Sequence, residues 1–278
     1  MSATAPPLSA PARPARRAAP NPGAEARDGG ALRAPDVSVV VPMFDEAEAA
    51  EALVAEIAEA FAGWAFEIIV VDDASGDATA ARLAKAALTE PRLRPLRHGA
   101  NAGQSRAIRT GIRAARAPII VTLDGDGQNP PADAPALARA LMEAPAEVAM
   151  VAGERRRRRD PAAKRWASRL ANTVRQALLD DGAWDTGCGL KAFRRDAYLA
   201  LPYFDHMHRY LPALIRREGL GVLYREVGHR PRLSGRSKYT NLGRLGVALF
   251  DLAGVVWLRA RARSSGAVTA LAPDREPE

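Results

Sequence analysis

Two carboxylates one residue apart, Asp124 and Asp126, are the residues whose type and spacing most directly suggest chemistry. They stand in the segment LDGDGQ (residues 123–128), just after an apolar run. Oxygen ligands of this kind suit a hard divalent cation such as Mg²⁺ or Mn²⁺. The glycines beside them let a phosphate approach the backbone closely. The segment therefore predicts a metal–phosphate site, and an ordinary Asp/Gly turn is the alternative.

The second chemical feature is a local basic patch. The chain carries a net charge of +8, but residues 154–175 alone hold nine Lys and Arg against two acidic residues. Such a patch suits a phosphorylated substrate, anionic lipid headgroups or nucleic acid, although a solvated charged face is the plainer alternative. No familiar nucleic-acid-binding module can be recognised. We therefore expect an anionic partner other than nucleic acid, with a basic nucleic-acid-binding protein as a competing class.

Length and composition limit the remaining possibilities. The 278 residues are 47% hydrophobic, which is enough chain for one large folded domain or two small ones. A single cysteine excludes an intramolecular disulfide framework. Residues 1–35 are rich in Pro, Ala and Arg and lack apolar periodicity, so they predict a disordered tail.

The elements that must position these residues alternate along the chain. Apolar, β-branched runs predict strands, and longer stretches of helical spacing between them predict helices. Such alternation predicts an α/β fold with a mostly parallel sheet, whose ligands bind beyond the carboxyl ends of the strands. Asp72, Asp73, Asp124 and Asp126 all stand at such ends. The expected strands are Val37–Val41, Phe66–Val71, Arg94–Arg97, Pro118–Leu123 and Val148–Gly153, and the expected helices Glu46–Phe61, Thr79–Leu88, Ser105–Arg116 and Ala162–Leu179.

Four segments in this order resemble the GT-A nucleotide-sugar glycosyltransferases of family 2: PMFDE (42–46), VVDDASGD (70–77), NAGQ (101–104) and DGD (124–126). Two later segments, GCGLKAFRR (187–195) and RLSGRSKY (232–239), look like the polyprenol-phosphate branch, the dolichol-phosphate mannose synthase type. The resemblance covers roughly residues 36–260. It implies a GT-A, Rossmann-like sheet flanked by helices, and sugar transfer to a lipid phosphate.

The resemblance also implies site residues. Asp126 and Gln128 would bind Mg²⁺ or Mn²⁺, and Asp124, Asp126 and Lys238 would serve catalysis, with Asp185 as a candidate base or a structural residue. Arg155, Lys164, Arg165 and Ser168 would hold the acceptor phosphate. Donor-binding positions would be Pro42, Glu46, Asp73, Asn101, Gly103, Asp124, Arg232, Ser237 and Lys238.

The implied reaction is metal-dependent transfer with inversion from GDP-mannose or a UDP-sugar to undecaprenyl or dolichyl phosphate. A phosphate monoester is largely ionised at neutral pH, so a strong base is not required. The alternative within the family is transfer to a saccharide hydroxyl in cell-envelope polysaccharide synthesis. The sugar, the nucleotide, the lipid length and the oligomeric state stay open.

The most hydrophobic segment, Leu245–Leu258, has fourteen residues and contains Asp251. A membrane-spanning helix needs about 20 apolar residues, so this segment predicts an amphipathic helix lying in the interface of an anionic membrane. A core or dimer-interface helix is the alternative. We therefore expect a GT-A domain over 36–240, an interfacial helix over 241–263 and a disordered tail over 264–278. The expected location is the cytoplasmic face of the inner membrane, peripheral or monotopic.

Overall fold

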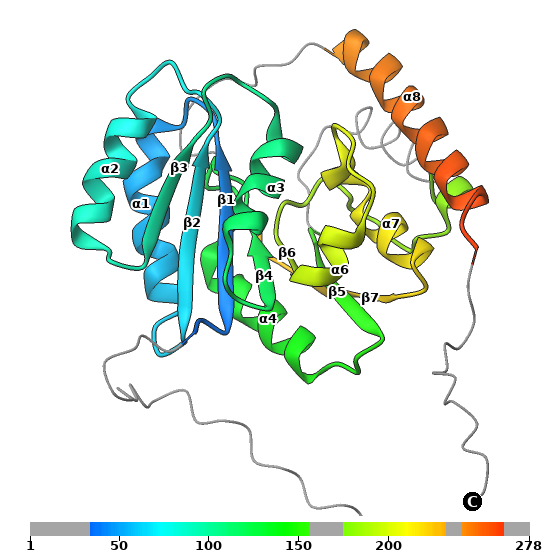
Figure 1. The fold of residues 1–278 in the computed structure, drawn as a ribbon, viewed down its shortest axis with the longest axis horizontal. Helices are drawn as coiled ribbons and strands as arrows, with labels where there is room; N and C mark the ends of the chain where they lie inside the picture. The colour runs from blue at the N-terminus through cyan, green and yellow to red at the C-terminus, as the bar shows by residue number, and fades with distance from the viewer. Residues whose placement is uncertain (1–33, 156–174, 232–240, 264–278) are drawn as a thin grey trace, which may run out of the picture.

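The computed structural model describes residues 34–155, 175–231 and 241–263. Its centre is a sheet with the strand order β3-β2-β1-β4-β6-β5-β7 (Figure 1). Strand β6 runs antiparallel to β4 and β5, while the other neighbouring strands are parallel. The strands are β1 (Val37–Met43), β2 (Phe66–Asp72), β3 (Leu93–Arg97), β4 (Ile119–Thr122), β5 (Val148–Glu154), β6 (Lys191–Arg194) and β7 (Gly221–Glu226).

Helices cover both faces of the sheet. One core contains side chains of α1, α2 and α4, and the other contains side chains of α3, α6 and α7. Helix α8 lies beyond α7, on the side of the molecule away from β3 (Figure 1). The helices are α1 (Ala47–Ala60), α2 (Thr79–Thr89), α3 (Gln104–Ala114), η1 (Pro131–Asp133), α4 (Ala134–Glu143), α6 (Arg195–Ala200), η2 (Met207–Arg209), α7 (Leu211–Arg217) and α8 (Asn241–Ala260).

Alternation along the central strands explains the unbroken apolar runs. In β1, Val39 and Val41 pack into the core under α1, whereas Val40 packs into the core under α3. In β2, Ile68 and Ile69 divide between the two cores in the same way. Both faces are buried, so successive positions of the central strands are mostly apolar. The prediction of a mostly parallel, doubly covered sheet is confirmed.

Strand β1 continues past the expected end at Val41. Pro42 lies inside the strand, opposite Val71 of β2. The ladder between β1 and β4 stops at Val40, so on that side the missing N–H of Pro42 costs no ladder bond. The strand expected over Val37–Val41 therefore ends two residues short of the observed strand.

Several predicted segments lie largely outside the described residues. These are the two terminal tails and most of the helix expected over Ala162–Leu179, of which residues 175–179 are helical. The helix expected near the C-terminus is present as α8. Among the described helices, none combines the length and apolar character that a membrane crossing requires. The domain boundaries stay predictions.

Candidate functional site

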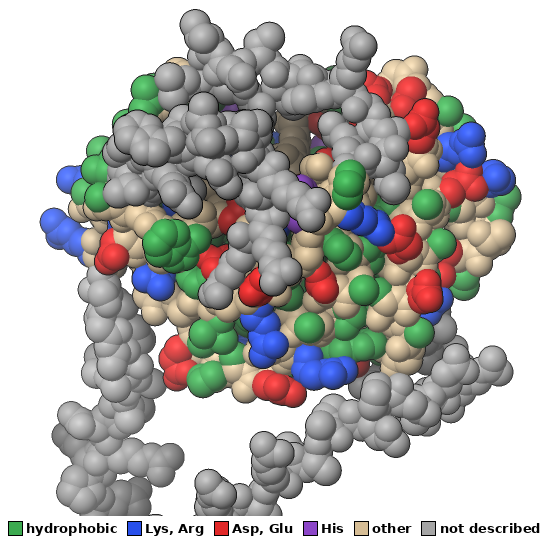
Figure 2. All heavy atoms as spheres, turned by 180° about the vertical axis from the view of Figure 1, so that it is seen from behind, with side chains coloured by type: hydrophobic (Ala, Val, Ile, Leu, Met, Phe, Trp, Pro, Cys, Tyr) green, Lys and Arg blue, Asp and Glu red, His purple; other side chains and the backbone are tan. Residues whose placement is uncertain are grey.

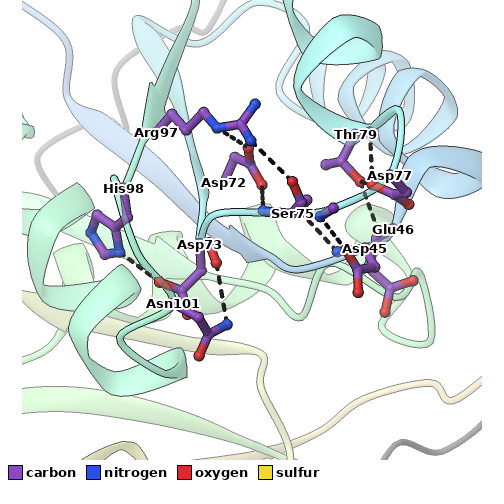
Figure 3. Close-up of polar contacts among 11 residues, drawn as sticks. Asp45, Glu46, Asp72, Asp73, Ser75, Asp77, Thr79, Arg97, His98 and Asn101 are labelled. Carbon is purple, nitrogen blue, oxygen red and sulfur yellow. Dashed lines mark hydrogen bonds and ion pairs between the residues drawn. The ribbon is translucent and has the colours of Figure 1, made fainter.

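The loops after β2 and β3 meet at Asp73. Its two carboxylate oxygens accept the backbone N–H groups of Ala102 and Gly103, at 2.9 and 2.8 Å. Asn101 donates its Nδ2 to the Asp73 carbonyl at 3.2 Å, and His98 Nδ1 lies 2.6 Å from Asp73 Oδ1 (Figure 3). The structure thus brings together three predicted donor-binding residues. Gly103 has φ +85°, which favours glycine where this loop enters α3.

A second set of bonds joins the loop after β1 to the loop after β2. Asp45 Oδ1 accepts the N–H of Gly76 at 2.8 Å, and the N–H of Asp45 donates to Ser75 Oγ at 2.9 Å (Figure 3). The N–H of Glu46 donates to Thr79 Oγ1 at 2.9 Å. Both loops are therefore fixed against each other, and the half-buried side chain of Glu46 stands at their junction.

The predicted metal loop follows β4 and packs against the end of β1. A Cβ on Gly125 would lie 2.6 Å from the carbonyl oxygen of Pro42, so only glycine fits there. Asp126 Oδ1 accepts the N–H of Gln128 at 3.1 Å. The described residues contain no cluster of three or more His, Cys, Asp or Glu side chains suited to a metal. A carboxylate and an amide oxygen on one turn nevertheless fit Mg²⁺ or Mn²⁺, because such ions take few protein ligands and complete their shell with substrate phosphates.

Arg230 holds this loop in place, which the sequence did not indicate. Its Nε donates to the carbonyl of Gly127 at 2.5 Å, and its Nη2 donates to Glu56 of α1 at 2.6 Å. Its own N–H bonds the carbonyl of Gln128 at 3.1 Å. A single arginine thus joins the loop between Asp126 and Gln128 to α1 and to the chain after β7.

Asp124 lies at the wall of a cavity of about 340 Å³. Its carboxylate sits so close to Gly189 that a Cβ there would approach it to 2.3 Å. Gln104 donates to Asp124 Oδ1 at 2.8 Å. Burial raises the pKa of Asp124, and the Asp126 carboxylate adds to that effect against the opposing charges of Lys191 and Arg155. The molecule seen from behind has a hollow with histidine side chains beside it (Figure 2).

The cavity walls come from α3, the end of β4, the loop before β6, β6 itself and η2 with α7. The lining residues are Gln104, Ile108, Thr122, Leu123, Asp124, Thr186, Gly187, Cys188, Gly189, Lys191, His208, Arg209 and Leu211. Of these lining residues the predicted site included only Asp124, and the buried Lys191 is the cation that it missed. The signal for Lys191 was a cation inside the apolar run of residues 190–193, which is easily taken for a solvent-facing strand position.

Arg155 and Asp185 form a buried ion pair. Arg155 Nε and Nη2 donate to the two oxygens of Asp185 at 2.5 and 2.9 Å, and each side chain is 8% exposed. The first residue was predicted to bind the acceptor phosphate and the second to be a candidate base. The structure pairs them with each other. Binding of the acceptor phosphate by Arg155, or action of Asp185 as a base, would therefore require this ion pair to break.

Six predicted residues lie outside the described part of the chain, and their roles stay predictions. They are Lys164, Arg165 and Ser168 of the acceptor set and Arg232, Ser237 and Lys238 of the donor set.

The fold is similar to those of solved glycosyltransferases. Glucosyl-3-phosphoglycerate synthase from Mycobacterium tuberculosis, in complex with Mn²⁺, uridine diphosphate and glucosyl-3-phosphoglycerate, superposes with a TM-score of 0.64. The superposition covers 84% of this chain and 82% of that chain, at 20% identity. The same enzyme in complex with Mg²⁺ and uridine diphosphate gives a TM-score of 0.63 at 19% identity. The predicted GT-A fold is confirmed.

The names of curated relatives describe transferases or synthases that combine a sugar with a polyprenyl phosphate. Undecaprenyl-phosphate 4-deoxy-4-formamido-L-arabinose transferase from Aeromonas hydrophila is 32% identical over 206 residues, covering 73% of this chain and 62% of that protein. Its counterpart from Pseudomonas paraeruginosa is 35% identical over 220 residues, 78% of this chain and 63% of that protein. Dodecaprenyl-phosphate galacturonate synthase from Rhizobium johnstonii is 32% identical over 237 residues, 82% of this chain and 69% of that protein.

The chain thus spans a little under two thirds of the length of the first two relatives. A sequence model described as glycosyl transferase family 2 matches residues 38–201, more than half of the chain. These residues include the segments that build the carboxyl edge of the sheet, from β1 to the loop after β4. The chain therefore belongs to glycosyl transferase family 2.

Proposed function

We propose that this protein transfers a sugar from a nucleoside-diphosphate donor to a polyprenyl phosphate at a membrane surface. The observation that carries the proposal is the Asp124–Asp126 pair at the carboxyl edge of the sheet, directly beside a cavity large enough for a sugar. The names of the curated relatives support the acceptor class.

The donor nucleotide would lie over the loops after β1 and β2. The bonds around Asp73, Asp45 and Ser75 hold these loops in one conformation before any ligand arrives. A preformed site avoids the cost of ordering loops on binding. Glu46, Asn101 and Gly103 border the same region and would complete the contacts to base and ribose.

Asp126 and Gln128 would hold a divalent cation against the donor diphosphate. When bound, this cation supplies positive charge to the oxygen atoms on which negative charge develops as the diphosphate leaves. Arg230 and the close packing of Gly125 hold the backbone that carries Asp126 and Gln128. Lys238 would add a further positive charge from the segment that follows β7.

The sugar would occupy the cavity between Asp124 and the loop that contains Gly189. Attack by an ionised phosphate oxygen on the anomeric carbon, opposite the departing diphosphate, would invert the configuration there. Arg155 would orient the acceptor phosphate after exchanging its bond to Asp185 for one to the phosphate. No strong base is needed, because the acceptor is already an anion at neutral pH.

Helix α8 would place the protein on the cytoplasmic face of the membrane. Phe250 and Trp257 are 81% and 63% exposed on this helix, whereas Val255 is buried against the body of the protein. Arg261 and Arg263 follow and are exposed. Apolar side chains beside basic ones suit an anionic bilayer surface.

The transfer itself is tested with labelled nucleotide sugars, Mg²⁺ or Mn²⁺, and undecaprenyl phosphate in vesicles. Label should enter the lipid phase, and Asp126→Ala should lower this transfer on the order of 100-fold because the diphosphate loses its counter-charge. Asp196→Ala is the matched control, since that side chain is 97% exposed and outside the site. If the label enters a soluble saccharide instead, the proposed lipid acceptor is wrong and the acceptor is a saccharide hydroxyl.

The membrane contact is tested by flotation with vesicles of phosphatidylcholine, with and without phosphatidylglycerol. Phe250→Glu should reduce the bound fraction about tenfold, because an exposed aromatic side chain is exchanged for an anion. Leu88→Glu on α2 is the control, since Leu88 is 85% exposed on another part of the surface. Equal binding by all three proteins would remove α8 from the proposal.

A further inference from the structure

Lys191 places a cation in the wall of the cavity with little to neutralise it. The residue is 5% exposed, and it occupies the first position of β6, opposite Thr122 of β4. Among the described residues, its ammonium donates only to the carbonyl of Cys188. No described carboxylate lies within ion-pair distance of it.

Such an arrangement is costly without a partner. A lysine ammonium has three donors, and a buried charge normally pairs with an opposite charge or is neutralised. Burial lowers the pKa of Lys191, while Cys188, Asp124 and Asp185 oppose that effect. The ammonium of Lys191 therefore has two further donors without a partner among the described residues, and the residue lines a cavity that a ligand can enter.

The neighbours of Lys191 on the cavity wall add donors. Arg209 lines the same cavity and carries a second positive charge. The His208 ring bonds Ser105 Oγ through Nδ1 at 2.7 Å, and its Nε2 has no hydrogen-bond partner among the described residues. Asp124, on the wall formed by the end of β4, supplies an acceptor instead. The cavity thus offers an acceptor on one wall and a group of donors, two of them cationic, on another.

We propose that Lys191, with Arg209 and His208, binds an anionic oxygen group that a substrate carries into this cavity. The inference rests on the proposed function and makes its substrate class narrower. The group is either a carboxylate on the transferred sugar, as in a uronic acid, or the phosphate of the prenyl acceptor. Both present oxygen atoms that an ammonium and an imidazole N–H can bond.

Isothermal titration with the full chain and Mn²⁺ separates the two sources. If the sugar carries the group, UDP-glucuronate binds at least about tenfold more tightly than UDP-glucose, a difference typical of one charge-assisted hydrogen bond. Lys191→Met removes that difference, Lys191→Arg keeps it, and binding of UDP alone stays unchanged. If the acceptor carries the group, the two nucleotide sugars bind with the same affinity, and Lys191→Met weakens the binding of farnesyl phosphate by a similar factor.

Lys85→Met is the matched control, because Lys85 is an exposed lysine on α2. Thermal melting checks that Lys191→Met is folded, which is expected because removal of a buried charge often leaves stability unchanged or higher. The comparison of UDP-glucuronate with UDP-glucose uses the wild-type protein alone, so it does not depend on whether a variant folds.

Unchanged binding of all ligands by Lys191→Met overturns the proposal, and so does an equal loss for every ligand including UDP. If the wild-type protein binds neither UDP nor GDP, the proposed function fails. The farnesyl phosphate titration then still decides whether Lys191 binds an anion.

Discussion

Glu67 and Asp124 are carboxylates at opposite ends of the same sheet, and they differ in how many donors surround them. Glu67 stands at the start of β2 and accepts bonds from Ser38 Oγ, the Arg116 N–H and Nε, and Arg94 Nη1, at 2.6 to 3.0 Å. Asp124 follows β4 and, within the part of the chain that the structure describes, accepts one side-chain bond, from Gln104.

The two acids respond to burial in opposite ways. Burial would raise the pKa of Glu67, but the bonds from Arg116, Ser38 and Arg94 outweigh it and hold that pKa below its usual value. Burial raises the pKa of Asp124, and its few donors do not compensate. Breaking the bonds of a buried, fully hydrogen-bonded carboxylate is costly, whereas a partly buried carboxylate that is short of donors at a cavity wall is a candidate for ligand binding. Substitution of Asp124 should therefore change the transfer activity, whereas substitution of Glu67 should change the free energy of unfolding.

Asp124→Asn should give the largest effect. The amide keeps the shape beside Gly189 but loses the negative charge, so sugar transfer should fall on the order of 100-fold. The free energy of unfolding should stay unchanged or rise, because a carboxylate short of donors is removed. Activity assays and urea unfolding measure the two quantities, and Asp196→Asn serves as control. A large loss of stability would show that the contrast with Glu67 is wrong.

Glu67→Gln should have the reverse signature. The side-chain NH₂ of the glutamine would face at least one of the N–H or O–H groups that now donate to Glu67. Because that donor would lose its bond, the free energy of unfolding should fall by about 3 kcal/mol. Transfer activity per folded molecule should match the wild type. Glu51→Gln is the surface control, since its ion pairs with Arg82 and Lys85 are exposed and contribute little to stability. Equal losses for both variants would contradict the stabilising role of Glu67.

A smaller effect is expected from the pH dependence of unfolding. Burial, followed by the charges of Arg209, Lys191 and His206, holds the pKa of His208 well below its usual value of 6.5. The unfolded chain therefore binds a proton below pH 6.5 that the native protein does not, so stability is lost as the pH falls. The linked loss between about pH 7.5 and 5.5 is about 1 kcal/mol. In His208→Gln, the free energy of unfolding should fall less over this pH range, by that amount. If its dependence on pH is unchanged, other groups cause it.

The sequence predicted the sheet because its signal is local. The β-branched runs at residues 37–41 and 66–71 can be satisfied only by strands buried on both faces, and the fold has them there. The aspartates after such runs had to reach the carboxyl edge, and the resemblance to a known family placed Asp73, Asn101 and Gly103 in one donor site there. Strand β6 was not foreseen, because its four residues begin with a lysine and end with an arginine and so contain no apolar run to detect.

By itself, therefore, the sequence determined the α/β fold, the edge of the sheet at which the candidate site lies, and the family. Only the tertiary structure decided the state of each charge. It paired Arg155 with Asp185, placed Arg230 on the loop of residues 126–128 and left Lys191 at the wall of a cavity. These outcomes depend on segments 30 to 103 residues apart in the chain. A charged residue looks the same in sequence whether a distant segment supplies its partner or leaves the position to a ligand.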